Sequence, residues 1–115
     1  MLKPERGDVW LVRFPFTNLS AAKLRPALVW ALHGEDAIVI GIFSRIPAAE
    51  LRATWLLVTE AHAQFAKTGL KKASIIKAEK IAIIHEGIFH RKLGDLPADL
   101  MQRVERALRL ALLLP

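Results

Sequence analysis

The sequence predicts a mainly β domain of antiparallel strands followed by one C-terminal helix. Short runs of aliphatic and β-branched residues recur between Val9 and Ile84, and glycine, proline and charged residues separate them. An apolar stripe at helical spacing between Leu100 and Ala111 is typical of an amphipathic helix. The 115 residues contain no linker and no internal repeat, so we expect a single domain over residues 1–115.

The first predicted strand is the apolar run Val9–Val12. Pro15 lacks the amide hydrogen that a central strand needs, so this strand should end there or reach a sheet edge. A loop of small and polar residues, Thr17–Lys23, follows it. Apolar sequence resumes after Arg25. Pro26 biases the backbone of Arg25 toward an extended conformation. The Arg25 guanidinium, at the start of a strand and beside a loop, is therefore well placed to bind phosphate.

A hairpin is predicted next. Its strands are Ala27–Leu32 and Ala37–Phe43, and Gly34 in the turn His33–Asp36 can take a positive φ. The second strand is apolar almost throughout, as is typical of a strand buried on both faces. Ser44 therefore lies at the end of a central strand, where functional side chains are often carried.

Shorter elements are expected between this hairpin and the final helix. The Thr59 hydroxyl could cap a short helix over Glu60–Ala66, and Gly69 would end it. A turn-rich link punctuated by glycine precedes the final helix. The remaining predicted elements are strands at Thr54–Val58, Ser74–Lys77 and Ile81–Ile84 and one helical turn at Ile88–Lys92.

The closing segment gives the clearest helical pattern. Pro97 suits a first-turn position. Leu100, Val104, Leu108 and Ala111 follow at steps of three or four residues, with charged residues on the other side. The last leucines widen this stripe beyond what a monomer needs, so part of it should cover an interface.

Charge and composition limit the class of partner. The chain carries 17 Lys and Arg against 11 Asp and Glu, a net charge of +6, which favours RNA, DNA or an acidic protein. It has no apolar run long enough for a membrane span and no signal peptide core. It also has no cysteine. These features fit a cytoplasmic protein, and the hydrophobic content of 53% supports self-association.

Several stretches resemble one known family. The block GDVWLVRFPFTNLS, followed closely by LRPALV, resembles the N-terminal signature of the MazF/PemK family of toxin endoribonucleases. Gly69-Leu70 with Ser74–Ile76 resembles a later strand entry of that family, and Arg91–Gly94 resembles the link into its last helix. The resemblance implies a compact, SH3-like β-barrel with a C-terminal α-helix, as in MazF-, PemK- and CcdB-like proteins.

The resemblance also implies a function. We expect an mRNA interferase: a sequence-selective endoribonuclease toxin that cuts single-stranded RNA without a metal ion or other cofactor. Its products would carry a 2′,3′-cyclic phosphate and a 5′-hydroxyl. The expected partners are RNA, a cognate acidic antitoxin and a second copy in a homodimer. Two alternatives stay open, namely a protein of the same fold that poisons DNA gyrase and an inactive family member that only binds RNA.

Arg25 and Ser44 are the predicted catalytic residues. The planar guanidinium of Arg25 can meet two phosphate oxygens and never deprotonates, and the family's Arg-Pro motif, here Arg25-Pro26, carries its catalytic arginine. Ser44 matches a family serine or threonine that hydrogen-bonds the reacting phosphate or the 2′-oxygen. The alternatives are an arginine salt-bridged at a strand start and a hydroxyl that satisfies a turn backbone.

Further RNA contacts are expected from the loop before Arg25 and from the residue after Ser44. These residues are Thr17, Asn18, Lys23 and Arg45. A tryptophan could also stack a base, although apolar neighbours favour a core position for Trp10 and Trp30. The sequence contains no zinc motif and no glycine-rich phosphate loop, so no metal site is predicted. It assigns neither the proton donor nor the proton acceptor.

Overall fold

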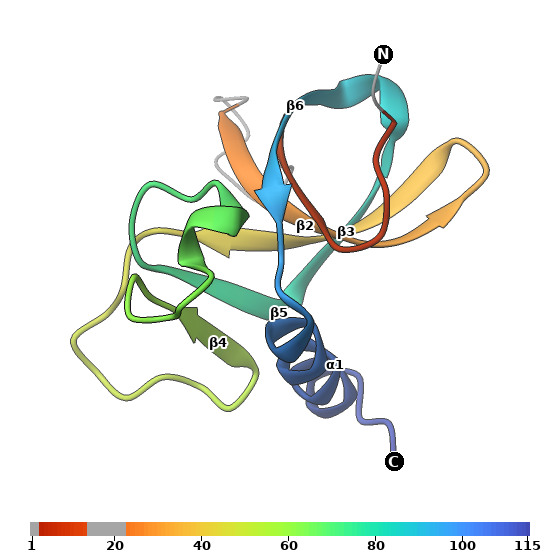
Figure 1. The fold of residues 1–115 in the computed structure, drawn as a ribbon. Coiled ribbons are helices and arrows are strands. Elements are labelled where there is room, and N and C mark those ends of the chain that lie inside the picture. Colours follow the sequence, from red (N-terminus) through yellow and green to blue (C-terminus); the bar gives the residue numbers. More distant parts are fainter. Residues whose placement is uncertain (1–2, 14–22) are drawn as a thin grey trace.

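The computed structural model describes residues 3–13 and 23–115. In these residues it contains six strands, two short 3-10 helices and one α-helix (Figure 1). The strands are β1 (Asp8–Arg13), β2 (Leu24–His33), β3 (Asp36–Phe43), β4 (Trp55–Val58), β5 (Ser74–His85) and β6 (Phe89–Asp95). The helices are η1 (Phe65–Thr68), η2 (Glu86–Ile88) and α1 (Ala98–Ala111).

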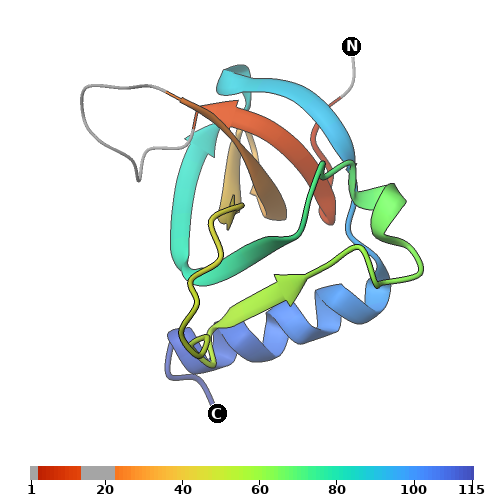
Figure 2. The same cartoon turned by 90° about the vertical axis from the view of Figure 1, so that its left-hand side faces the viewer.

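All six strands belong to one antiparallel sheet, in the order β4-β5-β3-β2-β1-β6. The sheet curls strongly, and α1 runs alongside β4 (Figure 2). Strands β4 and β6 form its two edges, so the curl does not close into a complete barrel. The predicted fold class, a mainly β, SH3-like barrel with a C-terminal helix, is confirmed in this open form.

Hydrophobic side chains cover both faces of the curved sheet. The larger cluster joins sheet residues such as Ile42 and Ile76 to Leu100 and Val104 of α1. A second cluster, around Val29, lies against the other face. The central strand β3 contributes to both clusters, which confirms the prediction drawn from its apolar sequence.

The hairpin and the C-terminal helix form as predicted. His33 at the end of β2 pairs with Asp36 at the start of β3, and Gly34 has a φ of 62°. In α1 the predicted stripe faces inward, since Leu100, Val104 and Leu108 are buried. The helix stops at Ala111, and the leucines after it are exposed.

The two strands predicted at Ser74–Lys77 and Ile81–Ile84 are wrong as separate elements, because they form one strand, β5. Strand β3 pairs with both parts of it, at Ile75 and Ile76 and again from Ile81 onward, whereas β4 pairs only with the first part. The register against β3 shifts between Ile40 and Ile42. A bulge of this kind bends a strand without ending it, so Glu79 and Lys80 are accommodated inside the strand.

The helix predicted over Glu60–Ala66 is also wrong. The Thr59 hydroxyl does accept a hydrogen bond, from the Ala61 amide at 3.3 Å, but only a turn follows. The helical segment is η1, four residues long, and Gly69 ends it in the left-handed conformation as predicted. The predicted segment is mostly exposed, so it lacks the buried face that stabilises a short helix.

The helical turn predicted at Ile88–Lys92 is a third error. The 3-10 helix η2 ends at Ile88, and Phe89 begins strand β6. This strand pairs with β1 along the edge that β2 leaves free. Pairing satisfies backbone groups that β1 would otherwise expose, and this gain is not visible in local sequence.

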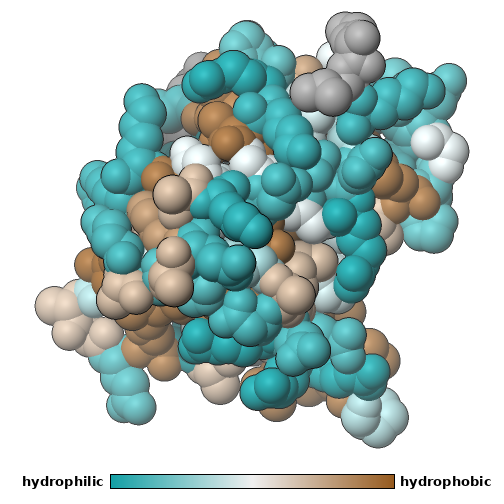
Figure 3. Space-filling view, viewed as in Figure 1, coloured by the Kyte–Doolittle hydropathy of each residue, from teal (hydrophilic) through white to brown (hydrophobic). Residues whose placement is uncertain are grey.

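The surface is mostly polar. On the face in Figure 3, hydrophilic side chains predominate and hydrophobic ones form separate patches. No helix among the described residues is long and apolar enough to cross a membrane.

Candidate functional site

A cavity of about 540 Å³ opens where β2 begins and β3 ends. It is lined by three cations, two aromatic rings, one hydroxyl and one proline: Arg25, Arg45, Lys77, Phe43, Trp55, Ser44 and Pro47. The strand register explains this grouping. Trp55 of β4 pairs directly with Lys77 of β5, and Phe43 of β3 pairs with Ile75 of β5. Directly paired residues point to the same side of a sheet, so adjacent strands bring these side chains to one face.

Two cations lie close to each aromatic ring of the cavity. The Arg25 guanidinium lies 5.6 Å from the Phe43 ring centre, and the Lys77 ammonium lies 4.6 Å from the same ring. Lys77 is also 4.4 Å from the Trp55 ring, and Arg52 is 5.0 Å from it. Each such contact contributes roughly 0.5–1 kcal/mol at an exposed site. The rings therefore help to hold like charges close together without a ligand.

Lys77 has an unusual environment for a lysine. Burial is the largest influence that lowers the pKa of its ammonium group below the ordinary 10.5, and repulsion from Lys80, Arg52 and Arg25 lowers it further. Glu79 opposes these influences without reversing them. A lysine with a lowered pKa gives up its proton more readily, which suits a general acid.

Glu79 holds the Trp55 ring in place within this group of rings and cations. Burial acts to raise the pKa of its carboxyl, but hydrogen bonds from Trp55 and Thr54 outweigh burial, and the net pKa is lowered. Trp55 Nε1 donates to one carboxylate oxygen at 2.6 Å, and Thr54 Oγ1 donates to the other at 2.8 Å. Arg52 adds an ion pair at 3.3 Å. The Glu79 carboxylate is thus held by hydrogen bonds and an ion pair within the protein, and it orients the Trp55 ring.

Arg25 carries an unsatisfied donor. Within residues 3–13 and 23–115, its Nε atom is buried and has no hydrogen-bond partner. An unpaired buried donor costs roughly 1–3 kcal/mol. The described part of the protein therefore leaves one donor of the predicted arginine unsatisfied.

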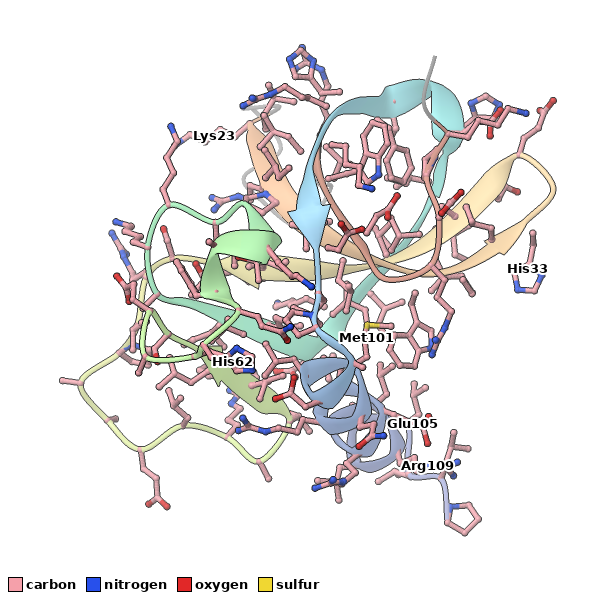
Figure 4. The ribbon with its side chains drawn as sticks, viewed as in Figure 1. Lys23, His33, His62, Met101, Glu105 and Arg109 are labelled. Atoms are coloured by element: carbon pink, nitrogen blue, oxygen red, sulfur yellow. The ribbon has the colours of Figure 1, made fainter. Side chains whose placement is uncertain are left out.

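The structure brings together three of the six predicted site residues. Arg25, Ser44 and Arg45 line the cavity. Lys23 is exposed just before β2 and is not among the lining residues; Figure 4 shows it on the opposite side of the molecule from Glu105 and Arg109. Thr17 and Asn18 lie outside the described residues.

The tryptophans divide between core and cavity. Trp10 is 6% exposed, and its Nε1 donates to the buried Asp8 carboxylate at 2.9 Å. Trp30 packs against the larger core cluster, with Arg6 over its ring at 4.5 Å. Only Trp55 of the three lines the cavity. A base-stacking role therefore fits Trp55.

Sequence reasoning missed Lys77, Phe43 and Glu79. One signal was available, because Lys77 follows three apolar or small residues in a predicted strand and interrupts its buried pattern. The pairing of Lys77 with Trp55 depends on strands distant in sequence and could not be predicted locally. Among the described residues, no group of three or more His, Asp or Glu side chains is placed to hold a metal ion.

The chemistry of this cavity matches a planar ring joined to an anion. Arg25, Arg45 and Lys77 supply positive charge, and the lining residues in the described part of the chain include no carboxylate. Phe43 and Trp55 supply ring faces on which a flat aromatic group can stack. Ser44 adds a group that can both donate and accept a hydrogen bond. A nucleotide combines these ligand features.

Comparison with known families gives one match over most of the chain. The family described as "PemK-like, MazF-like toxin of type II toxin-antitoxin system" matches residues 5–112. No curated protein sequence matches the chain.

Solved structures share the fold at low sequence identity. A mycobacterial endoribonuclease in complex with its cognate antitoxin is 19% identical, with a TM-score of 0.72 and coverage of 97% of both chains. The Mycobacterium tuberculosis toxin MazF-mt6 is 19% identical, with a TM-score of 0.72, and the match covers 94% of this chain and 98% of that one. MazF from Deinococcus radiodurans is 21% identical, with a TM-score of 0.71 and coverage of 97% and 98%. At this identity the likeness shows the fold alone.

Proposed function

Because the chain belongs to the PemK-like, MazF-like family of toxins of type II toxin–antitoxin systems, we propose that it is a sequence-selective endoribonuclease that cuts single-stranded RNA without a metal ion. The observation that supports this proposal is the cavity at the start of β2. Arg25, Ser44 and Lys77 line it together with the rings of Phe43 and Trp55. Single-stranded RNA is the polyanion whose bases are free to stack on exposed rings. The net charge of +6 supports the same substrate.

Arg25 binds the scissile phosphate in this mechanism. Its planar fork donates two hydrogen bonds to the non-bridging oxygens, where charge builds up as the phosphorus becomes pentacoordinate. Ser44 hydrogen-bonds the phosphate or the attacking 2′-oxygen, and Arg45 contacts a neighbouring phosphate. The positive charge that a metal ion supplies in other nucleases comes here from side chains.

The bond changes follow from this placement. The 2′-oxygen attacks phosphorus and loses its proton to water, while the bond from phosphorus to the 5′-oxygen breaks. Lys77 gives its proton to the departing 5′-oxygen. One product then ends in a 2′,3′-cyclic phosphate and the other begins with a 5′-hydroxyl. Lys77 fills the role of proton donor that the sequence left unassigned.

Purified protein incubated with a single-stranded RNA provides the direct test. We expect cuts at a restricted set of sequences, unchanged in EDTA, with a cyclic phosphate upstream and a 5′-hydroxyl downstream of each cut. We also expect a small acidic antitoxin, acting in the cytoplasm with this toxin, to stop the cutting by covering the basic cavity. Intact RNA together with inhibited DNA gyrase would instead support the gyrase-poison alternative, and RNA binding without cuts would support an inactive member.

A homodimer is expected from the exposed apolar end of the chain. Leu110, Leu112, Leu113 and Leu114 are 56%, 53%, 89% and 53% exposed. They are held in a defined turn, because the Leu112 amide donates to the Leu108 carbonyl and the Leu114 amide to the Arg109 carbonyl, both at 2.8 Å. An ordered, exposed apolar patch favours association. Light scattering at micromolar concentration should give twice the chain mass, and a monomer mass would contradict this prediction.

A further inference from the structure

A second cavity, of about 330 Å³, lies beside the candidate site. Its walls come from β1, β2, β3, β6 and the loop that leads into β5, and they are mostly apolar: Leu11, Leu24, Pro26, Ile42, Leu70 and Leu93. Lys71, Lys72 and Arg91 stand at its edge and are exposed. Among its lining residues in the described chain there is no carboxylate. An apolar interior with a cationic edge fits an uncharged ring attached to a phosphate chain.

The two cavities meet at the predicted catalytic residues. Arg25 and Ser44 line both of them. Successive residues of a strand point to opposite faces of the sheet, so Arg25 and Phe43 face the first cavity while Pro26 and Ile42 face the second. The strand ends at Leu24 and Ser44 therefore separate the two spaces. A phosphate held at this point would have one neighbouring nucleoside on each side.

The wall formed by the loop before β5 is built rigidly. A Cβ atom added to Gly69 would collide with the backbone of Leu93, and one added to Gly94 would collide with the backbone of Lys67. The loop and β6 thus pack backbone against backbone. The buried Thr68 hydroxyl donates to the Phe65 carbonyl at 2.7 Å and accepts from the Leu70 amide at 3.1 Å. A wall fixed in this way gives a preformed pocket of the kind that selects ligands by shape.

We infer that the second cavity receives the nucleobase on one side of the scissile phosphate and selects that base by its shape. This inference rests on the proposed endoribonuclease function. RNA is favoured over an acidic peptide as the occupant because the cavity shares Arg25 and Ser44 with the site of phosphate transfer. The two cavities then have different roles. In the first cavity, stacking on Phe43 and Trp55 tolerates every base. The second cavity, which is rigid and apolar, discriminates among bases.

The test uses two leucines on the same strand. Leu24 lines the second cavity and is 37% exposed, whereas Leu32, near the other end of β2, is 38% exposed and does not line it. Leu24→Trp should fill the pocket while leaving the fold intact, and Leu32→Trp is the matched control. Each protein is given a random-sequence RNA pool, and the bases around every cut are counted by sequencing.

We expect Leu24→Trp to change the base preference by about tenfold at one position next to the cut, since apolar pockets discriminate by roughly 10- to 200-fold. The other positions, and the whole profile of Leu32→Trp, should match the wild type. Leu24→Trp that cuts with an unchanged profile would overturn the inference while leaving the proposed function standing. The inference would also be overturned, with the proposed function left standing, if the only effect of Leu24→Trp were a loss of inhibition by an acidic antitoxin peptide. A wild-type protein that cuts no RNA would overturn both.

Leucine methyl NMR with an uncleavable RNA, in which the attacking hydroxyl is replaced by hydrogen, gives a second measurement. Methyl signals of Leu24, Leu70 and Leu93 should shift on binding, and those of Leu112 should not. Shifts confined to residues around Trp55 would place RNA in the first cavity alone and would overturn the inference without any reliance on turnover.

Discussion

Replacing Arg25 by alanine should reduce RNA cleavage by roughly 100- to 1,000-fold, the usual loss when one donor that stabilises transition-state charge is removed. The reason is the position of this guanidinium at the meeting point of both cavities, with its buried Nε atom unsatisfied by the described part of the protein. Initial rates on a fluorescent RNA measure the effect.

The fold should survive this substitution. Arg25→Ala removes a ring contact with Phe43, which costs at most about 1 kcal/mol, and it also removes a buried donor that has no partner in the described chain. Circular dichroism and the thermal midpoint should therefore stay near the wild-type values. Arg25→Lys should restore little activity, because a point charge cannot reproduce two parallel hydrogen bonds.

A charge-matched control separates this site from a general loss of positive charge. Arg103→Ala removes an exposed arginine of α1 that lines neither of the two cavities. We expect it to cut at nearly the wild-type rate at moderate salt. Equal rates for well-folded Arg25→Ala and Arg103→Ala would rule out Arg25 as the phosphate ligand.

Local sequence was enough to predict the elements whose stability is local. The hairpin between β2 and β3 carries its own turn glycine, and α1 carries its own stripe of buried residues. Arg25 and Ser44 were predicted because each lies next to a feature visible along the chain, a proline or a strand end, and because the family resemblance implies a catalytic role for both. The structure then places both on the lining of one cavity.

Pairing between strands distant in sequence determines the features that local sequence could not predict. Strand β6 exists because β1 has a free edge, and β5 stays continuous because β3 pairs with both of its parts and β4 with the first. The same pairing created the part of the site that was missed. Lys77 and Trp55 are 22 residues apart in sequence, and only the register of β4 against β5 sets them face to face.

The second large effect is expected at Lys77. If this lysine protonates the departing 5′-oxygen, Lys77→Ala should slow cleavage by about 100- to 10,000-fold, the usual contribution of a general acid. Loss of its contacts with Phe43 and Trp55 could also disturb the cavity. A rate loss alone is therefore a weaker test than the dependence of rate on pH.

The sign of that dependence follows from the chemistry. A general acid must carry its proton, so activity is present below the pKa of Lys77 and is lost as pH rises through it. Burial and neighbouring cations lower this pKa, so the loss should occur below the ordinary lysine value of 10.5. Lys80 is the largest charged contributor to the lowering. Lys80→Gln should therefore raise the pKa of Lys77 and move the alkaline loss of kcat to higher pH.

This shift shows whether activity requires the protonated form of Lys77. If the protonation of Lys77 had no part in the reaction, Lys80→Gln would leave the alkaline limb in place. Lys77→Arg gives the complementary result: it keeps a cation between the rings but holds its proton to much higher pH, so activity should fall and its alkaline limb should disappear. A Lys77→Arg protein with full activity and the wild-type pH profile would exclude Lys77 as the proton donor.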